Sequence, residues 1–295
     1  MTDNLNLSGL VSTSPSFRAP IHQTRNINLS EDILKRIEDK LQPMLYQTYI
    51  SCDILRLSTE TRFSAMVFVH RYMIAVETNK PENSAKQSET SREASDDKAG
   101  SRWIWAACLF LACKAEEEPR RLRDVINLAH MLSSSSSSSS SSKDIHNNII
   151  SIADSPPALD NHYWDSKKVI VAAEQSVLRW LGFDTTVIHP HRAAKILLEG
   201  CSTNTSTERL QAITFRRLND ALFYTPALTH SALELACAAI HLALGEVERV
   251  EGREAVRVHG WGQDWWGKFG ISNDGIERTK EDLEKATEYL RSVAD

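Results

Sequence analysis

The stretch from Trp103 to Ile126 constrains the fold of this chain more than any other part of it. Its first eleven residues, Trp103–Cys113, carry no charge, whereas the next ten, Lys114–Arg123, hold one lysine, three glutamates, one proline and three arginines. A helix that is apolar on nearly every side has to be buried. We therefore interpret this stretch as a core helix whose charged tip reaches a surface where a partner binds.

Composition excludes several classes of protein. The chain has 295 residues, of which 41% are hydrophobic, which is enough for a core in one or two domains. Its net charge of -5 argues against a broad nucleic-acid or membrane surface. No apolar run reaches the roughly 18 residues that a membrane span needs. The N-terminus also lacks the pattern of a secretory signal. We therefore expect no membrane contact, and nucleic-acid binding is not favoured.

Motifs for metal, cofactor or catalytic chemistry are missing from the sequence. The five cysteines are odd in number and form no C-x-x-C pair, which is typical of reduced core cysteines in an intracellular protein. His189 and His191 do not have the spacing of a helical metal pair. No phosphate-binding glycine loop and no hydrolase, metalloprotease or kinase motif is present. The sequence therefore predicts a protein that is not an enzyme, with no metal, no cofactor and no small-molecule substrate.

Apolar residues recur at helical spacing along most of the chain, and no segment shows the alternation of a strand. The fold class predicted is all-α, with roughly ten helices in two sets. The expected helices cover residues 31–57 with a kink or break at Pro43, 61–76, 103–113, 121–132, 163–181, 189–198, 207–223, 230–244 and 274–291. A loop is expected at 246–260, and a short turn around the Trp261–Phe269 aromatic cluster.

Three segments are too polar to bury enough surface to offset the entropy lost on ordering. Residues 1–28 are expected to form a mobile tail, and residues 79–102 a disordered insertion. A second insertion is expected at 133–160, beginning with ten consecutive serines, Ser133–Ser142. These insertions must loop outward if the flanking helices are to pack.

A weak internal repeat supports the division into two sets. Ala106–Cys108 aligns with Cys237–Ala239, and each group lies in the third helix of its set. Small residues allow neighbouring helices to approach closely, as a central helix requires. In this alignment Lys114 falls on Gly245, so the charged tip belongs to the first set alone.

The motifs of the first set resemble those of the cyclins. The sequence LACKAEEEPRRLRDVIN, residues 111–127, is similar to the cyclin-box signature, and EQSVLRWLGF, residues 174–183, is similar to the family's fifth helix. HPHRAAKILL, from His189, resembles the start of the second fold in transcription-type cyclins. Residues 119–127 look most like cyclin L, whereas the Tyr163-Trp164 and Trp265-Trp266 pairs look more like cyclin Q.

The resemblance implies an architecture and a role. It implies two tandem five-helix cyclin folds after an N-terminal helix, the first at 29–186 and the second at 187–295. It also implies a nuclear regulatory subunit that forms a heterodimer with a cyclin-dependent serine/threonine kinase and activates it, in RNA polymerase II transcription or RNA processing. The Met-Arg-x-Ile-Leu stripe by which cell-cycle cyclins dock substrates is absent, so recruitment of substrates by that route is not expected.

The resemblance also assigns residues. Lys114 and Glu174 match the charged pair that contacts the kinase's regulatory helix and the loop before it. Leu111, Leu178 and Phe183 match apolar positions that pack beside that helix.

Spacing alone leaves two interpretations of the charged pair open. Ile170, Glu174 and Leu178 lie at i, i+4 and i+8, so Glu174 is on or beside a buried stripe, where a carboxylate is costly unless paired. One solution is an ion pair with Lys114 that faces a partner's backbone. The other is that Lys114 only complements its helix C-terminus while Glu174 forms an internal salt bridge.

The rest of the charged tip is less specific. We expect residues 116–118 to be a solvated helix end. Arg120, Arg121 and Arg123 are candidates for a second contact, such as a phosphate on the partner, or else pair with the neighbouring acids. Two alternative functions are a cyclin-fold transcription factor that binds nucleic acid and a helical scaffold that binds no kinase.

Overall fold

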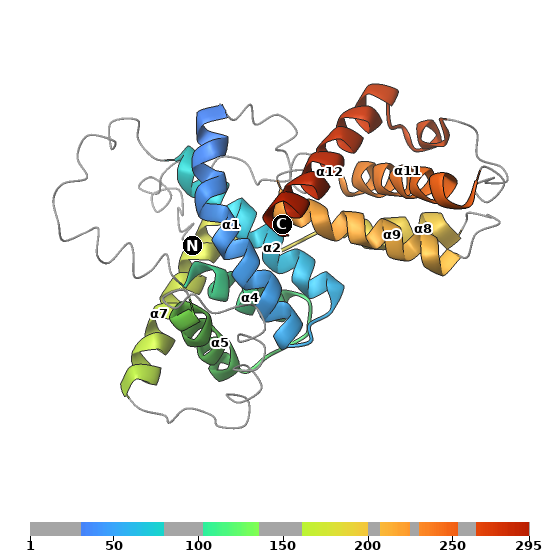
Figure 1. Ribbon diagram of the computed structural model, residues 1–295. Coiled ribbons are helices and arrows are strands. Elements are labelled where there is room, and N and C mark those ends of the chain that lie inside the picture. The colour runs from blue at the N-terminus through green and yellow to red at the C-terminus, as the bar shows by residue number, and fades with distance from the viewer. Residues whose placement is uncertain are drawn as a thin grey trace, which may run out of the picture.

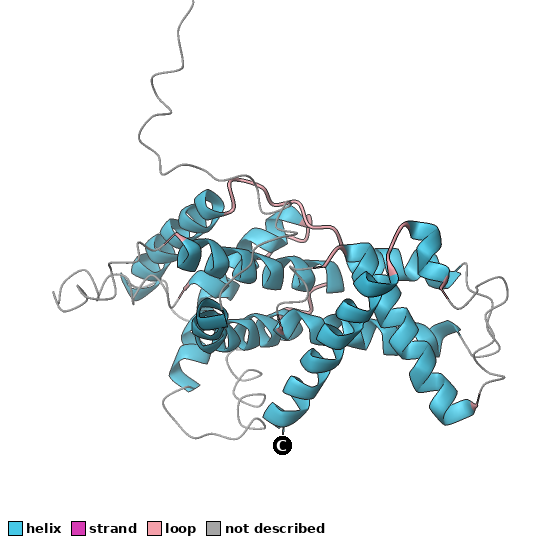
Figure 2. Ribbon diagram, turned by 90° about the horizontal axis from the view of Figure 1, so that it is seen from above, coloured by secondary structure: helices cyan, strands magenta, loops and turns pink. Residues whose placement is uncertain are grey.

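The computed structural model describes residues 31–79, 103–135, 161–199, 207–224, 230–252 and 264–294. Within these ranges every regular element is a helix, which confirms the all-α prediction (Figure 2). The predicted tail and nearly all of the two predicted insertions lie outside the described residues. None of the described helices is both long and apolar enough to cross a membrane.

The helices form two sets that lie side by side in Figure 1. The first set comprises α1 (Glu31–Ile54), α2 (Thr59–Thr78), α4 (Ile104–Ala115), α5 (Leu122–Ser135) and α7 (Asn161–Trp180). The second comprises α8 (Pro190–Glu199), α9 (Thr207–Asp220), the 3-10 segment η4 (Ala221–Phe223), α11 (Ala232–Glu251), the 3-10 segment η6 (Trp265–Phe269) and α12 (Asn273–Ala294).

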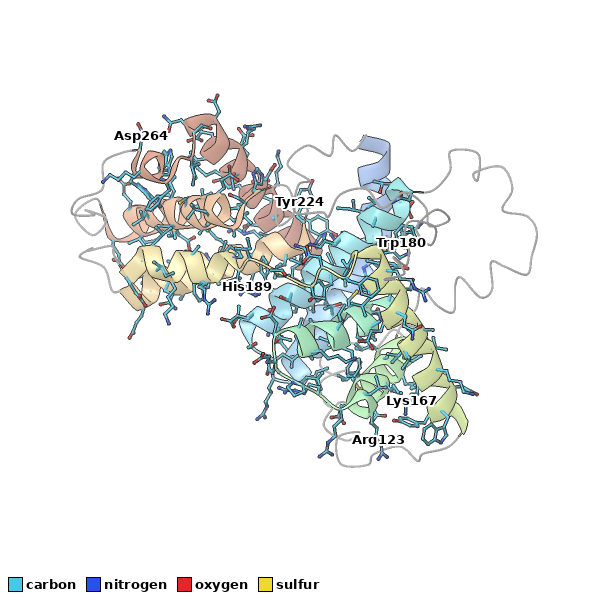
Figure 3. All side chains as sticks on the ribbon, turned by 180° about the vertical axis from the view of Figure 1, so that it is seen from behind. Arg123, Lys167, Trp180, His189, Tyr224 and Asp264 are labelled. Carbon is cyan, nitrogen blue, oxygen red and sulfur yellow. The ribbon has the colours of Figure 1, made fainter. Side chains whose placement is uncertain are left out.

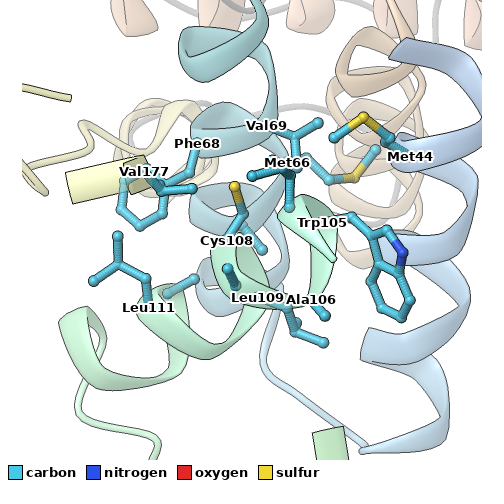
Figure 4. Close-up of a cluster of buried hydrophobic side chains, with 14 of the residues drawn as sticks. Met44, Met66, Phe68, Val69, Trp105, Ala106, Cys108, Leu109, Leu111 and Val177 are labelled. Carbon is cyan, nitrogen blue, oxygen red and sulfur yellow. The ribbon is translucent and has the colours of Figure 1, made fainter. Parts of the chain in front are cut away.

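Helix α4 is the centre of the first set, as its apolar sequence predicts. It packs against α1, α2, α5 and α7. Ala106, Ala107 and Cys108 are fully buried, and their small side chains let the surrounding helices approach closely. Figure 4 shows Cys108 among the α2 side chains and Trp105 reaching toward α1. The charged tip of α4 is therefore carried by the most enclosed helix of its set.

Helix α11 has the same position in the second set. It packs against α8, α9 and α12, and its Ala236–Ala239 segment is fully buried. A capping box between Ser231 and Glu234 starts the helix. The internal repeat therefore corresponds to two central helices, each the third α-helix of its set.

Three predicted boundaries differ from the structure. Of the kink or break expected at Pro43, the break is absent, because buried residues on both sides of it, Ile37 and Leu45 among them, pack α1 along its length while Pro43 itself is exposed. Helix α5 includes the first three serines of the decaserine tract. Helix α11 continues beyond the predicted end at Leu244 to Glu251, because Val247 is still buried in the second core.

The second set contains four α-helices and two 3-10 segments in its described part, so a count of five α-helices is reached only in the first set. Residues 253–263, between α11 and η6, lie outside the described part.

The segment η4 joins the two sets. Leu222 comes from the second set but is fully buried in the core of the first. Its carbonyl accepts a 2.7 Å hydrogen bond from His70 Nε2, and the Phe223 carbonyl accepts one of the same length from Gln42 Nε2. The Phe223 ring lies 5.2 Å from that of Tyr49. The core of the first set is therefore completed by the second.

This joint is expected to weaken in acid. Burial lowers the pKa of His70 from 6.5 to about 4, although the hydrogen bond to Leu222 opposes the shift. Between these two values the unfolded chain binds a proton that the folded chain does not. Acidification from pH 7 to pH 5 should therefore cost about 2 kcal/mol of stability through this histidine. His191, whose pKa burial also lowers to about 4, adds a similar amount.

Urea unfolding at the two pH values measures this loss. The variant His70→Gln offers an amide donor to the Leu222 carbonyl without titrating, so the loss of about 2 kcal/mol assigned to His70 should disappear. An unchanged pH dependence in that variant would contradict the assignment to His70.

Candidate functional site

The tip of α4 and the middle of α7 meet in an ion pair. Lys114 Nζ donates to Glu174 Oε1 at 2.5 Å, and the same ammonium lies 4.2 Å from the centroid of the Phe110 ring. The Glu174 side chain is 12% exposed and that of Lys114 48%. The predicted mutual pair is thus present, and it gives an almost buried carboxylate a cationic partner while the ammonium faces solvent. Sequence reasoning missed Phe110, although its i, i+4 spacing from Lys114 is a usable signal.

The apolar residues assigned to the site differ in accessibility. Leu111 is 5% exposed and belongs to the first core, so it supports α4 from within and offers little surface. Leu178 is half-buried at the edge of that core. Phe183 is 69% exposed just beyond the end of α7. Leu178 and Phe183 are therefore the members of this group that present an accessible apolar surface, at the C-terminal end of α7.

The backbone at the end of α7 holds Phe183 in an unusual conformation. Gly182 and Phe183 both have positive φ, 62° and 60°. The Phe183 N–H donates to the Leu178 carbonyl at 2.9 Å, and the Gly182 N–H to the Arg179 carbonyl at 3.0 Å, which closes the helix end. Glycine adopts this conformation without strain, but a phenylalanine in it costs on the order of 1 kcal/mol.

The prediction that residues 116–118 form a solvated helix end is wrong for two of the three. Glu116 accepts hydrogen bonds from Ser64 on α2 and from His189 Nε2, the latter at 3.2 Å. Glu118 accepts from the Ser58 backbone N–H at 3.0 Å and from the Thr61 hydroxyl at 2.7 Å. Glu117 between them is exposed and has a φ of 55°. The acids on either side of this bend therefore tie α4 to the start of α2.

Arg120 completes the same network. Its guanidinium donates to Glu118 Oε1 at 2.7 Å and to the carbonyls of Leu55 and Arg56 at 3.3 and 3.4 Å. Burial alone would raise the pKa of Glu118, but the hydrogen bonds from Ser58 and Thr61, together with Arg120, hold that pKa below its ordinary value. Arg120 thus joins the α1–α2 turn to the residues after α4.

The two other arginines of the tip lie toward α5. Arg121 is exposed immediately before that helix, and Arg123 is half-buried in its first turn. A phosphate contact through Arg121 or Arg123 stays a prediction, whereas Arg120 has a structural role that accounts for it.

The two histidines of the His-Pro-His segment and the described cysteines lie within the fold, whereas Cys201 is outside the described residues. His189 contacts Glu116, and His191 Nε2 lies 3.1 Å from Asn219 Oδ1. The described residues contain no group of three or more His, Cys, Asp or Glu side chains arranged to hold a metal ion. Burial raises the pKa of the Cys52 thiol to about 12 and that of Cys113 to about 11, which makes both unreactive.

A buried α4, a Lys–Glu pair on its tip and a fifth helix carrying the glutamate define a protein class. Residues 22–186, more than half of the chain, match the family model for the cyclin N-terminal domain. The chain therefore belongs to the cyclin family. The crystal structure of the yeast RNA Pol II CTD kinase CTDK-1 complex contains a chain with a similar fold, at a TM-score of 0.53 and 15% identity, covering 86% of this chain and 71% of that one.

Within the family, the chain is similar to cyclins L. Cyclin L homolog cyl-1 of Caenorhabditis elegans is 32% identical over 171 residues, which are 58% of this chain and 34% of that protein. Human Cyclin-L1 is 34% identical over 139 residues, 46% of this chain and 23% of that protein. Mouse Cyclin-L2 is 33% identical over 144 residues, 48% of this chain and 25% of that protein. The matched part of the chain thus spans between 23% and 34% of the length of these relatives.

Proposed function

We propose that this chain is the regulatory subunit of a cyclin-dependent serine/threonine kinase, which it binds and activates as a heterodimer. The observation that carries this proposal is the Lys114–Glu174 pair, which forms where the tip of the central helix meets α7, with Phe183 exposed just beyond the end of α7. The pair presents a cation and a carboxylate side by side, which suits the N–H and C=O groups of a helix end and its preceding loop.

Activation by such a surface needs no chemistry from the cyclin itself. A protein kinase is active only when its αC helix is placed so that a lysine and a glutamate of the kinase pair. A rigid bundle that holds that helix in place is a sufficient activator. Lys114 and Glu174 would fix the helix and the loop before it, while Leu178 and Phe183 would pack beside it. The chain would therefore be a non-enzymatic subunit.

The proposed setting is the nucleus, in RNA polymerase II transcription or RNA processing. The similarity to cyclins L supports this proposal. We also propose that residues 29–186 and 187–295 are two tandem cyclin folds. The equivalent positions of α4 and α11 support that division.

Purification of the tagged chain from its own cells, followed by mass spectrometry, tests the proposal. A kinase catalytic subunit should be recovered in about equal amount. That subunit, purified alone, should phosphorylate an RNA polymerase II tail peptide at least about tenfold faster once the chain is added. The proposed function would be contradicted if no kinase were recovered, or if the chain left the rate of the recovered kinase unchanged. A nucleic-acid-binding or scaffold function would then be favoured.

A further inference from the structure

The outward side of α7 carries large apolar residues at an interval of seven. Trp164 is 48% exposed and Val171 37%, whereas Leu178 is half-buried against the first core. A position that repeats every seven residues drifts by about 20° per repeat around a straight helix. The side chains of this row are therefore exposed to solvent at the N-terminal end of α7 and lie at the edge of the first core at its C-terminal end. We call Trp164, Lys167, Val171, Glu174 and Leu178 the α7 stripe.

Trp164 stays half exposed at the start of α7. Its neighbour Tyr163 packs against the first core, and Ser166 lies 2.9 Å from His130 Nε2 on α5, so these residues attach the start of α7 to the bundle. The Trp164 ring lies 5.4 Å from that of Tyr163 and 5.0 Å from the Lys167 ammonium, and among the described residues it belongs to neither hydrophobic core. Tryptophan is among the residues that contribute most when an interface covers them.

The stripe is continuous with the proposed kinase contact. Glu174 and Leu178 belong to both, and Trp164 lies fourteen residues before Leu178, about 21 Å along the helix. Figure 3 labels Lys167 and Trp180 toward opposite ends of α7. Lys167 and Lys168 make the outer end cationic, although Lys168 also pairs with Asp165 at 3.0 Å. The far end of the stripe is therefore complementary to an acidic, apolar surface.

We propose that the kinase subunit covers the whole α7 stripe, with an amphipathic segment whose apolar side chains bury Trp164 and Val171 and whose carboxylate pairs with Lys167. This inference rests on the proposed function and extends it. The Lys114–Glu174 end would hold the kinase's regulatory helix, and the Trp164 end would select kinases that carry the additional acidic segment.

Binding of the recovered kinase subunit to immobilised full-length variants tests this extension. Trp164→Ala should raise the Kd about 30-fold. Lys167→Glu should slow association and reduce its dependence on salt, because the charge that steers an acidic partner is reversed. The matched control is Phe269→Ala, which removes an aromatic ring that is 43% exposed on η6, and its Kd should stay within about twofold of wild type. Thermal melting of each variant checks that it is folded.

The outcomes separate this inference from the proposed function. Weaker binding by folded Trp164→Ala, with Phe269→Ala unchanged, supports the extended contact. Wild-type binding by Trp164→Ala, while Lys114→Glu binds poorly, would overturn the extended contact and leave the proposed function standing. Wild-type binding by both variants would overturn both.

Discussion

Exchanging the charges of the central ion pair, by Lys114→Glu together with Glu174→Lys, is expected to abolish kinase binding while leaving the protein folded. The exchange restores an attraction between α4 and α7, so the internal pair can form with reversed polarity. A partner group that donates a hydrogen bond to Glu174 would then face an ammonium. A partner group that accepts one from Lys114 would face a carboxylate. Loss of such contacts typically costs 2–5 kcal/mol, so the Kd should rise at least about 30-fold.

Each single variant should also lose binding, but with some loss of stability. Lys114→Glu would place two carboxylates at the position of the present pair, one of them on the mostly buried Glu174 side chain. Comparing the single and exchanged variants therefore separates the role of the pair within the fold from its role toward the kinase.

Isothermal titration with the kinase subunit and thermal melting of each variant give the two readouts. The matched control is Lys285→Glu with Glu277→Lys, which makes the same two changes at exposed positions of α12. Normal binding and activation by the exchanged variant would show that the pair is structural only.

Truncation of the η4 leucine, Leu222→Ala, is expected to destabilise both sets of helices together. Leu222 is fully buried in the first core although it belongs to the second set. Leu→Ala changes at such positions cost about 2–5 kcal/mol, which corresponds to a fall in Tm of roughly 5 to 15 °C for a chain of this size. The hydrogen bonds from His70 and Gln42 to this segment make its position specific, so a shift cannot refill the cavity without breaking them.

Calorimetry combined with hydrogen exchange shows whether the two sets of helices lose stability together or separately. Amides of α4 and α11 should lose protection by similar factors in Leu222→Ala. Val250→Ala, at a site on α11 that is 67% exposed, serves as the control and should change Tm little. Loss of protection confined to α11 would show that the first set is stable without its neighbour.

Helix identity was predictable wherever burial follows a clear period. The apolar run of α4, the stripe of α1 and the small-residue segment of α11 each indicate their packing directly. Boundaries were less predictable, because packing outweighs local preference: α1 continues through Pro43 and α11 continues past Leu244. The path of η4 into the first core was not predictable, since nothing local to Leu222 indicates which core it enters.

The candidate site also has contacts that the sequence predicts and contacts that it does not. The buried stripe indicated that Glu174 needs a partner, and the resemblance to the cyclins favoured Lys114 as that partner. The inward contacts of Glu116 and Glu118 did not follow, because a run of acids after a helix has no periodicity, and the bend at Glu117 that points its neighbours toward α2 is visible only in the structure. Ser58, the N-cap of α2, donates both its backbone N–H and its hydroxyl to Glu118, and a serine cap does not announce such a partner in the sequence.

At position 183, selection for stability and selection for partner binding favour different residues. Its left-handed backbone is strained for phenylalanine but not for glycine, and its 69% exposed ring gains little from packing within the fold. A lineage that kept only the fold would therefore tend to replace it with glycine or asparagine. Retention of a large apolar residue at this position across descendants would record continued use of the surface, and its loss would date the point at which a descendant stopped needing a partner.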